Sequence, residues 1–249
     1  MSSSSSEFPT DPYSAAQQKW LYQDHLVLPT LESLLKGKLD DKKVLDIGCG
    51  NGHNSTTFLK WGAAKVVGFD YSEEMIRNCK SLPRSPKSEF YHLDVCDFSL
   101  DDRFDVATAV FVLQYVHDKE KLRKAIRNIS SHLNEGAVLI GLLPNGVAGV
   151  CAPETAGELM GAAIDKRGDP YVDGELVTAN FYEGKVVKCT STMALHSNVF
   201  YEKCFKEAGF KSVEWLAPTL SDEGRRILGE KFCHQFLNPP VDIVFRCSK

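Results

Sequence analysis

The sequence contains no apolar run near the roughly 20 residues that a membrane-spanning helix requires, so we expect no membrane partner. Its eight cysteines include no C-x-x-C pair, and because metal-binding knuckles need such closely spaced ligands, we expect no metal site. Lysine and arginine number 29 against 33 aspartates and glutamates, which gives a formal net charge of −4. This balance disfavours the extended basic face with which proteins bind nucleic acid, so we expect no nucleic-acid partner.

The first residues also lack a targeting pattern. Met1 is followed by serines at residues 2–6, without the basic region or apolar core of a secretory signal. We expect residues 1–11 to be a disordered tail and the protein to be cytoplasmic, with reduced thiols. The chain is 43% hydrophobic and 25% charged, as ordinary globular proteins are, and residues 12–249 fit a single domain.

Strand patterns alternate with helical patterns through the first part of the chain. In the helical pattern of residues 119–133, Leu122, Ala125 and Ile126 share one face, and Lys and Arg residues lie on the other. Strict alternation predicts a doubly wound α/β fold with a mostly parallel sheet and right-handed crossovers. The expected strands are residues 43–47, 65–69, 90–94, 104–112 and 137–143, with a helix at 73–80 and an N-terminal helical segment at 12–37 that Pro29 interrupts.

The alternation stops after residue 143. Residues 146–197 form an insertion longer than an ordinary connection, with a hairpin expected around Glu183 and Gly184. Such an insertion at the carboxyl edge of a parallel sheet is where specificity elements lie. Beyond it we expect a helix at 198–208, a strand at 211–216, a helix at 221–236 and a last strand at 241–247.

The most informative segment is residues 43–52, KVLDIGCGNG. A buried strand ends in an acid and then three glycines at alternate positions, which lets the backbone turn sharply and a ligand approach closely. The following helical pattern offers a helix N-terminus to that ligand. The next strand ends at Asp70, which is well placed to accept hydrogen bonds from ribose hydroxyls. Strand, turn, helix, strand and acid together predict a nucleoside-binding half of the sheet.

The spacing of the glycines bears on which nucleoside is bound. A dinucleotide fingerprint needs a third glycine at the position of His53, and the acid Asp46 would repel a pyrophosphate. The segment instead resembles the D-x-G-x-G-x-G signature of class I S-adenosylmethionine (SAM) methyltransferases, and residues 68–72, GFDYS, resemble their second signature. This resemblance implies a seven-stranded, doubly wound sheet in which the last strand is inserted antiparallel between strands five and six.

The resemblance also implies a set of SAM-binding residues. The turn and Asp46 would face the amino-acid end of SAM, Asp70 the ribose, and Tyr71 and Met75 the adenine. Asp94 matches the acid after strand three that commonly receives the adenine amino group; a turn or helix-capping role is its alternative. The full expected set is Asp46, Gly48, Gly50, Gly52, Asp70, Tyr71, Met75, Asp94, Val95, Phe111, Gln114 and Tyr22.

Three further side chains are candidates for the catalytic step. The segment before strand one often folds over SAM in this family, so Tyr13, with Trp20 and Tyr22, is a candidate cover; ordinary packing of these aromatic residues is the alternative. Tyr115 and His117 follow strand four. A histidine titrates near neutrality and is a candidate general base, although a solvent-facing loop position also accounts for His117.

These patterns predict a SAM-dependent methyltransferase that acts on a small polar or heteroaromatic metabolite by in-line displacement, with nitrogen favoured over oxygen or sulfur. The planar-amine motif of base methyltransferases is missing after strand four; a similar run, Asn238 to Val241, precedes the last strand instead. Two alternatives remain open. One is methylation of a protein or peptide, and the other is a non-catalytic SAM-binding subunit that pairs with an active partner.

Overall fold

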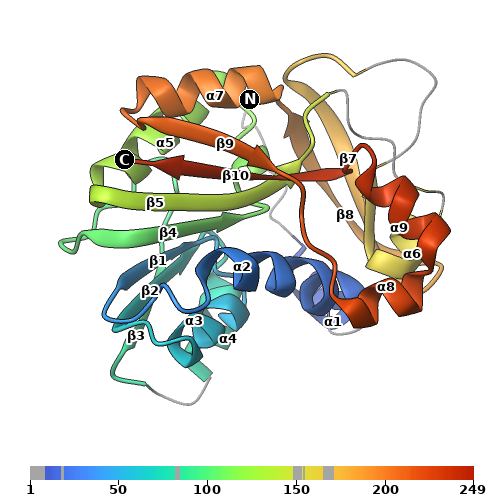
Figure 1. Ribbon diagram of the computed structural model, residues 1–249, viewed down its shortest axis with the longest axis horizontal. Helices are drawn as coiled ribbons and strands as arrows, with labels where there is room; N and C mark the ends of the chain where they lie inside the picture. Colours follow the sequence, from blue (N-terminus) through green and yellow to red (C-terminus); the bar gives the residue numbers. More distant parts are fainter. Residues whose placement is uncertain (1–8, 18–19, 82–84, 148–152, 154, 165–170) are drawn as a thin grey trace, which may run out of the picture.

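The computed structural model describes residues 9–17, 20–81, 85–147, 153, 155–164 and 171–249 (Figure 1). Within them, one seven-stranded sheet has the order β3-β2-β1-β4-β5-β10-β9. Neighbouring strands from β3 to β5 run parallel, and β10 is antiparallel to both β5 and β9, as the resemblance implies. The strands are β1 (Lys43–Ile47), β2 (Lys65–Asp70), β3 (Ser88–His92), β4 (Phe104–Val110), β5 (Leu133–Pro144), β9 (Ser212–Leu216) and β10 (Asp242–Ser248).

Helices cover both faces of this sheet. On one face α2 (Leu28–Leu35) and α3 (His53–Lys60) pack on Val106 of β4, and on the other α5 (Lys119–Ser131) and α7 (Asn198–Glu207) pack on Ala107 and Ala109. Successive strand residues point to opposite faces, so a strand buried on both sides is apolar along its whole length. This is why the central strands were predictable as apolar runs. The helix α4 (Glu73–Ser81) lies against β2 and β3.

The N-terminal segment differs from the expected interrupted helix. α1 (Thr10–Gln17) starts within the predicted tail, of which residues 1–8 lie outside the described part of the chain. Pro29 does not interrupt the second helix: a π-helical turn, η1 (Gln23–Val27), continues directly into α2. Proline leaves the carbonyl four residues earlier without its helical donor. The backbone N–H of Ser221 donates to that carbonyl, of His25, at 2.9 Å and so satisfies it.

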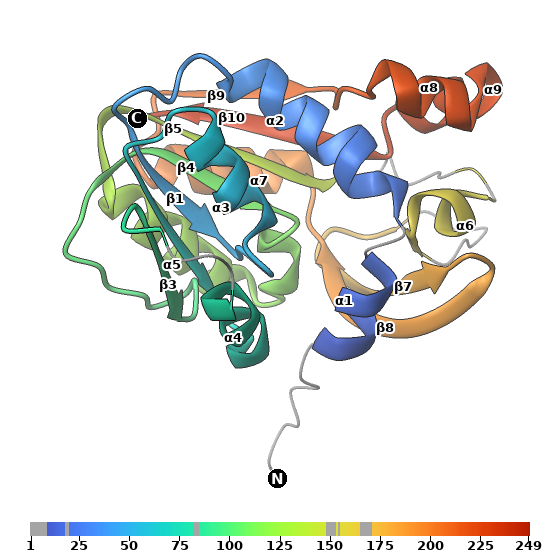
Figure 2. The ribbon, with the colours of Figure 1, turned by 90° about the horizontal axis from the view of Figure 1, so that it is seen from below.

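The insertion forms a small antiparallel sheet of its own, with the order β6-β7-β8. The predicted hairpin is confirmed as β7 (Glu175–Glu183) and β8 (Val186–Leu195), with β6 (Ala162–Ile164) as a further strand and α6 (Ala156–Met160) before it. Figure 2 shows α1 beside β7 and β8, and these elements are in contact.

The single helix predicted at 221–236 is divided in two. α8 (Asp222–Leu228) and α9 (Glu230–Leu237) meet at Gly229, whose φ of +78° is incompatible with a continuing helix. The run Asn238 to Val241 leads into β10, as the sequence predicts.

Candidate active site

The glycine-rich turn follows β1 at the carboxyl edge of the sheet. Gly48, Gly50 and Gly52 all have positive φ angles, of +62°, +53° and +77°. A Cβ atom on Gly48 would lie 2.4 Å from Cγ2 of Val112, so this position needs glycine for space as well as for conformation. The turn thereby keeps its backbone close to the loop that follows β4.

Asp70 holds the turn in place from the end of β2. Its Oδ2 accepts a hydrogen bond from the backbone N–H of Gly50 at 2.9 Å, and its Oδ1 accepts one from the N–H of Ser72 at 2.9 Å. Burial raises the pKa of Asp70, and these backbone donors act in the opposite direction. Each carboxylate oxygen keeps a further lone pair, so the side chain can bind a ligand hydroxyl while it orders the turn.

Asp46 lies below the turn and not at the cavity surface. Its side chain is buried, with Oδ2 accepting from Oγ of Ser55 at 2.5 Å and Oδ1 accepting from Oγ1 of Thr108 at 2.9 Å. Burial raises the pKa of Asp46 to about 6, against the lowering effect of the two hydroxyls. Asp46 therefore ties β1 to α3 and β4, and any effect on a ligand comes through the turn.

A cavity of about 1480 Å³ opens at this edge of the sheet. Gln114 is buried beside it, and its Oε1 has no hydrogen-bond partner in the described part of the chain. Asp94 accepts from the N–H of Cys96 at 2.8 Å, as its turn role requires, and also lines the cavity. The other predicted cofactor residues on the cavity wall are Gly48, Gly50, Gly52, Asp70, Tyr71, Met75, Val95, Phe111, Gln114 and Tyr22.

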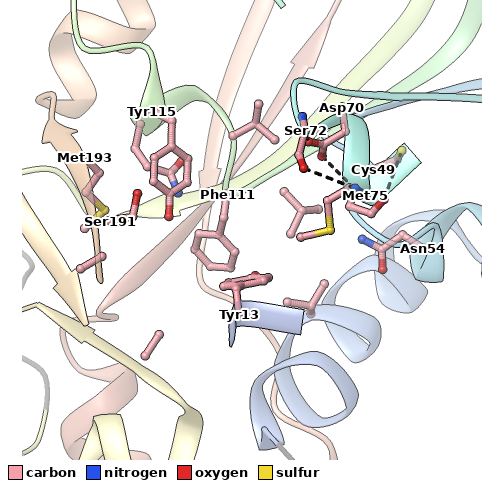
Figure 3. A pocket seen from close by; sticks show the side chains of 18 of the residues that line it. Tyr13, Cys49, Asn54, Asp70, Ser72, Met75, Phe111, Tyr115, Ser191 and Met193 are labelled. Atoms are coloured by element: carbon pink, nitrogen blue, oxygen red, sulfur yellow. Dashed lines mark hydrogen bonds between the residues drawn. The ribbon is translucent and has the colours of Figure 1, made fainter. Parts of the chain in front are cut away.

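Aromatic side chains divide this cavity into two compartments. The structure places Tyr13 and Phe111 centrally, with Asp70, Ser72 and Met75 on one side and Tyr115, Ser191 and Met193 on the other (Figure 3). We call the first side the turn compartment and the second the insertion compartment. Phe111 has a φ of +54°, a strained conformation for a residue with a side chain, and such strain gathers at functional sites.

The three predicted catalytic side chains all line the cavity. Burial raises the pKa of Tyr13 and of Tyr115 well above the usual tyrosine value, so neither phenol ionises near neutral pH. His117 is exposed, and its Nε2–H donates to the carbonyl of Thr192 at 3.0 Å, which leaves Nδ1 as the acceptor nitrogen. His117 is therefore the one of the three that presents a free acceptor nitrogen.

Sequence reasoning missed Asp242, at the start of β10. Because β10 runs antiparallel to its neighbour β5, its first residue lies at the carboxyl edge, beside Pro144. Its side chain is buried, lines the cavity and accepts a hydrogen bond from the hydroxyl of Tyr22. The acid after the two prolines of the lead-in was the only signal in the sequence, and it is a weak one.

The insertion supplies further lining that sequence reasoning did not specify. Phe181 on β7 stacks on Trp20 with ring centroids 5.7 Å apart, and the Trp20 Nε1–H donates to the Tyr182 carbonyl at 2.6 Å. The N-terminal segment is thus attached to the insertion. In the described residues there is no group of three or more possible metal ligands, and no helix there is long and apolar enough to cross a membrane.

The strand order and the turn geometry lead to a family. Residues 44–136 match the family model of a methyltransferase domain. By this match, residues 44–136 form a methyltransferase domain. The methyltransferase family predicted from the two sequence signatures is confirmed, and the matched residues include the glycine turn, Asp70 and Met75.

Comparison with whole proteins supports this domain and its fold. A trans-aconitate 2-methyltransferase of Rhodopseudomonas palustris strain BisA53 is 30% identical over 148 residues, 58% of this chain and 52% of that protein. An mRNA cap guanine-N(7) methyltransferase of Cryptococcus neoformans is 27% identical over 134 residues, 46% of this chain and 22% of that protein. The chain thus aligns with about half of the first relative and less of the second.

A solved SAM-dependent methyltransferase from Mesorhizobium loti has the same fold, with a TM-score of 0.62. The two chains are 17% identical, and the match covers 89% of this chain and 96% of that one. The fold predicted from the alternation of strands and helices is therefore confirmed over nearly the whole chain.

Proposed function

We propose that this protein is a SAM-dependent methyltransferase that acts on a small polar or heteroaromatic molecule, with nitrogen favoured as the methylated atom. The observation that carries the proposal is the coupling of Asp70 to the glycine turn: one carboxylate both holds the N–H of Gly50 and lines the cavity. The matched domain supplies the family, and the insertion compartment supplies room for an acceptor.

The residues of the turn compartment fit SAM. Gln114 offers a buried oxygen without a partner, which is the group that a ligand ammonium would complete. Asp70 offers lone pairs to ribose hydroxyls, and Asp94 and Val95, which also line the cavity, would face the adenine. Bound SAM supplies a methyl group on a positively charged sulfur, whose leaving group is already activated. The protein therefore has to hold the acceptor in line and exclude water.

In this proposal the N-terminal cover excludes water. Tyr13 meets Trp20 and Phe181 edge to face, with ring centroids 5.0 and 4.9 Å apart. This cluster packs α1 against β7 at the wall of the cavity. His117 is the candidate proton acceptor at the neighbouring wall, and Tyr115 and Tyr13 are positioning groups in this proposal because their pKa values are raised.

A nucleotide acceptor is the second candidate function. It is favoured by the likeness to the cap guanine-N(7) methyltransferase of Cryptococcus neoformans, which methylates a ring nitrogen by its printed name. Methylation of a protein or peptide, and a SAM-binding subunit with an active partner, are the remaining alternatives.

The cofactor site is tested by calorimetric titration of the purified chain with SAM. We expect binding in the wild type and a loss of about 100-fold or more in Asp70→Ala, because two charge-assisted hydrogen bonds and the order of the turn are lost. Asp101→Asn, an exposed acid outside the cavity, is the control and keeps the wild-type affinity. Absence of SAM binding in the wild type contradicts the proposal.

The acceptor class is tested with methyl-labelled SAM. The protein is incubated separately with a cell extract, a capped RNA and a mixture of peptides, and the label is followed by mass spectrometry. Label in low-mass products supports the small-molecule acceptor, and label in capped RNA supports the nucleotide. Label in peptides alone, or SAM binding without any transfer, supports the corresponding alternative.

A further inference from the structure

One buried acid on the cavity wall is not among the expected cofactor-binding residues. Asp242 is 5% exposed, and its Oδ2 accepts the hydroxyl of Tyr22. Its Oδ1 accepts no hydrogen bond from any residue in the described part of the chain, and the side chain lines the cavity. This oxygen is therefore open to the cavity, where it can accept a hydrogen bond from a ligand.

Tyr22 joins this acid to the boundary between the two compartments. Its ring meets Phe111 with centroids 5.5 Å apart, and on its other side it meets Phe236 at 6.3 Å. Phe111 follows β4, on the wall where the methionine part of SAM is expected. Asp242 therefore lies one aromatic ring away from the wall where transfer would take place.

The surrounding wall favours a ligand with positive charge or an N–H donor. The rings of Trp20, Phe181 and Tyr22 pack into one cluster on this side, and aromatic faces attract cations. The described lining residues of the insertion and of the C-terminal segment include no lysine or arginine, and Asp242 is their one charged side chain. The two lysines of the lining, Lys60 and Lys121, belong to α3 and α5.

Resting on the proposed function, we infer that the methyl acceptor is an amine attached to an apolar or aromatic group, and that Asp242, oriented by Tyr22, binds its nitrogen. The nitrogen lone pair forms the bond to the methyl carbon while the carbon–sulfur bond breaks, and that bond's electron pair stays on sulfur. Before this step an acceptor that binds as an ammonium gives one proton to the Asp242 carboxylate, which frees the lone pair. After transfer the methylated nitrogen carries the positive charge that sulfur has lost.

Matched acceptors test this assignment. The probes are phenethylamine, histamine and tryptamine, each with the corresponding alcohol and propionate, and trans-aconitate is added as a polycarboxylate. Each is incubated with full-length protein and methyl-labelled SAM, and the initial rate of label transfer is measured. We expect transfer to at least one amine and slower transfer to its alcohol and propionate partners.

The variants separate binding from structure. Above pH 8, where the Asp242 carboxyl is ionised, Asp242→Asn keeps the shape of the side chain but raises the KM for the preferred amine about ten-fold or more, because a charge-assisted contact is lost. The Kd for SAM is unchanged. Tyr22→Phe raises this KM by a smaller factor. Asp101→Asn, an exposed acid outside the cavity, leaves both constants unchanged.

Each result has a defined meaning. No transfer to any amine, faster transfer to propionates or trans-aconitate, or an unchanged KM in Asp242→Asn overturns the inference. If SAM still binds and another acceptor is labelled, the proposed function stands without it. If SAM does not bind the wild type, the proposed function itself fails.

Discussion

Gly48 shows how little freedom the glycine turn has at the level of one residue. A Cβ there would lie 2.4 Å from Val112, whereas a Cβ on Gly50 would meet nothing within 4 Å. We expect Gly48→Ala to lower the free energy of unfolding by about 2–4 kcal/mol, from a positive φ and overpacking together, and to weaken SAM binding.

Gly136→Ala is the matched control for Gly48→Ala. Its φ is +77° and its Cβ would meet nothing within 4 Å, so only the conformational strain of about 1–2 kcal/mol applies. Denaturant unfolding and SAM titration of both variants make the comparison. Equal losses in the two variants contradict a steric role for the contact with Val112.

The raised pKa of Asp242 should make the free energy of unfolding depend on pH. Burial raises the pKa of Asp242 from 3.8 to about 8. Between these values the folded protein holds a proton that the unfolded chain has lost, so the free energy of unfolding falls as the pH rises. Each unit of difference is worth about 1.4 kcal/mol.

Asp242→Asn removes this proton linkage while the other titrating groups stay the same. We expect its Tm to exceed that of the wild type by a margin that widens from pH 5 to pH 8, by several degrees at about 2–4 °C per kcal/mol. Calorimetric scans at the two pH values measure the margin. A constant margin shows that Asp242 does not titrate in this range.

At the scale of elements, the N-terminal segment is tied to the insertion by Trp20. We expect Trp20→Ala to lower the free energy of unfolding by about 3–5 kcal/mol, because the stacking on Phe181 and a hydrogen bond are lost. Methyl transfer falls more than SAM binding, since the insertion compartment opens to water.

Trp215→Ala on β9 is the control for this cover. Trp215 packs on Phe245 with ring centroids 6.4 Å apart and is not part of the cavity wall. Its loss destabilises the fold but leaves the rate per folded molecule unchanged. The rate of methyl transfer is measured for Trp20→Ala and Trp215→Ala at a temperature where both variants are folded. Equal rates in the two variants contradict the role of Trp20 in the cover.

The elements that the sequence predicts well are those whose pattern is local and long. The amphipathic run of α5 and the apolar strands β1, β2 and β4 are examples, because periodicity alone determines their burial. The break at Gly229 and the continuation past Pro29 depend on distant partners. In the second case the N–H of Ser221 satisfies the carbonyl of His25, which no local pattern reveals.

The candidate site likewise has one part that the local sequence predicts and another that depends on distant contacts. The turn compartment was predictable because two consecutive strands and their turns contain most of it. The place of Asp242 in the site was not predictable, because only the antiparallel direction of β10 brings this residue to the carboxyl edge of the parallel strands. Asp46 was assigned to the cofactor, whereas its two hydroxyl partners place it under the turn.

At the scale of the whole molecule, cofactor binding should stabilise the entire fold. A ligand at 100 times its Kd adds about 2.7 kcal/mol, which corresponds to a rise in Tm of about 5–10 °C for a chain of this size. We expect SAM and S-adenosylhomocysteine to give this rise, and a chelator such as EDTA to leave the Tm unchanged. A fall in Tm with EDTA would reveal a metal that the proposal does not include.

The contact between Tyr22 and Asp242 joins two residues that are 220 positions apart in the sequence. The edge of β5 that pairs with β10 also stays unpaired until β10 has been synthesised. A nascent chain already contains the glycine turn and Asp70 long before Asp242 emerges, since domains assemble in the order of their synthesis. The residues of the turn compartment are therefore synthesised before the residue that completes the cavity wall at β10.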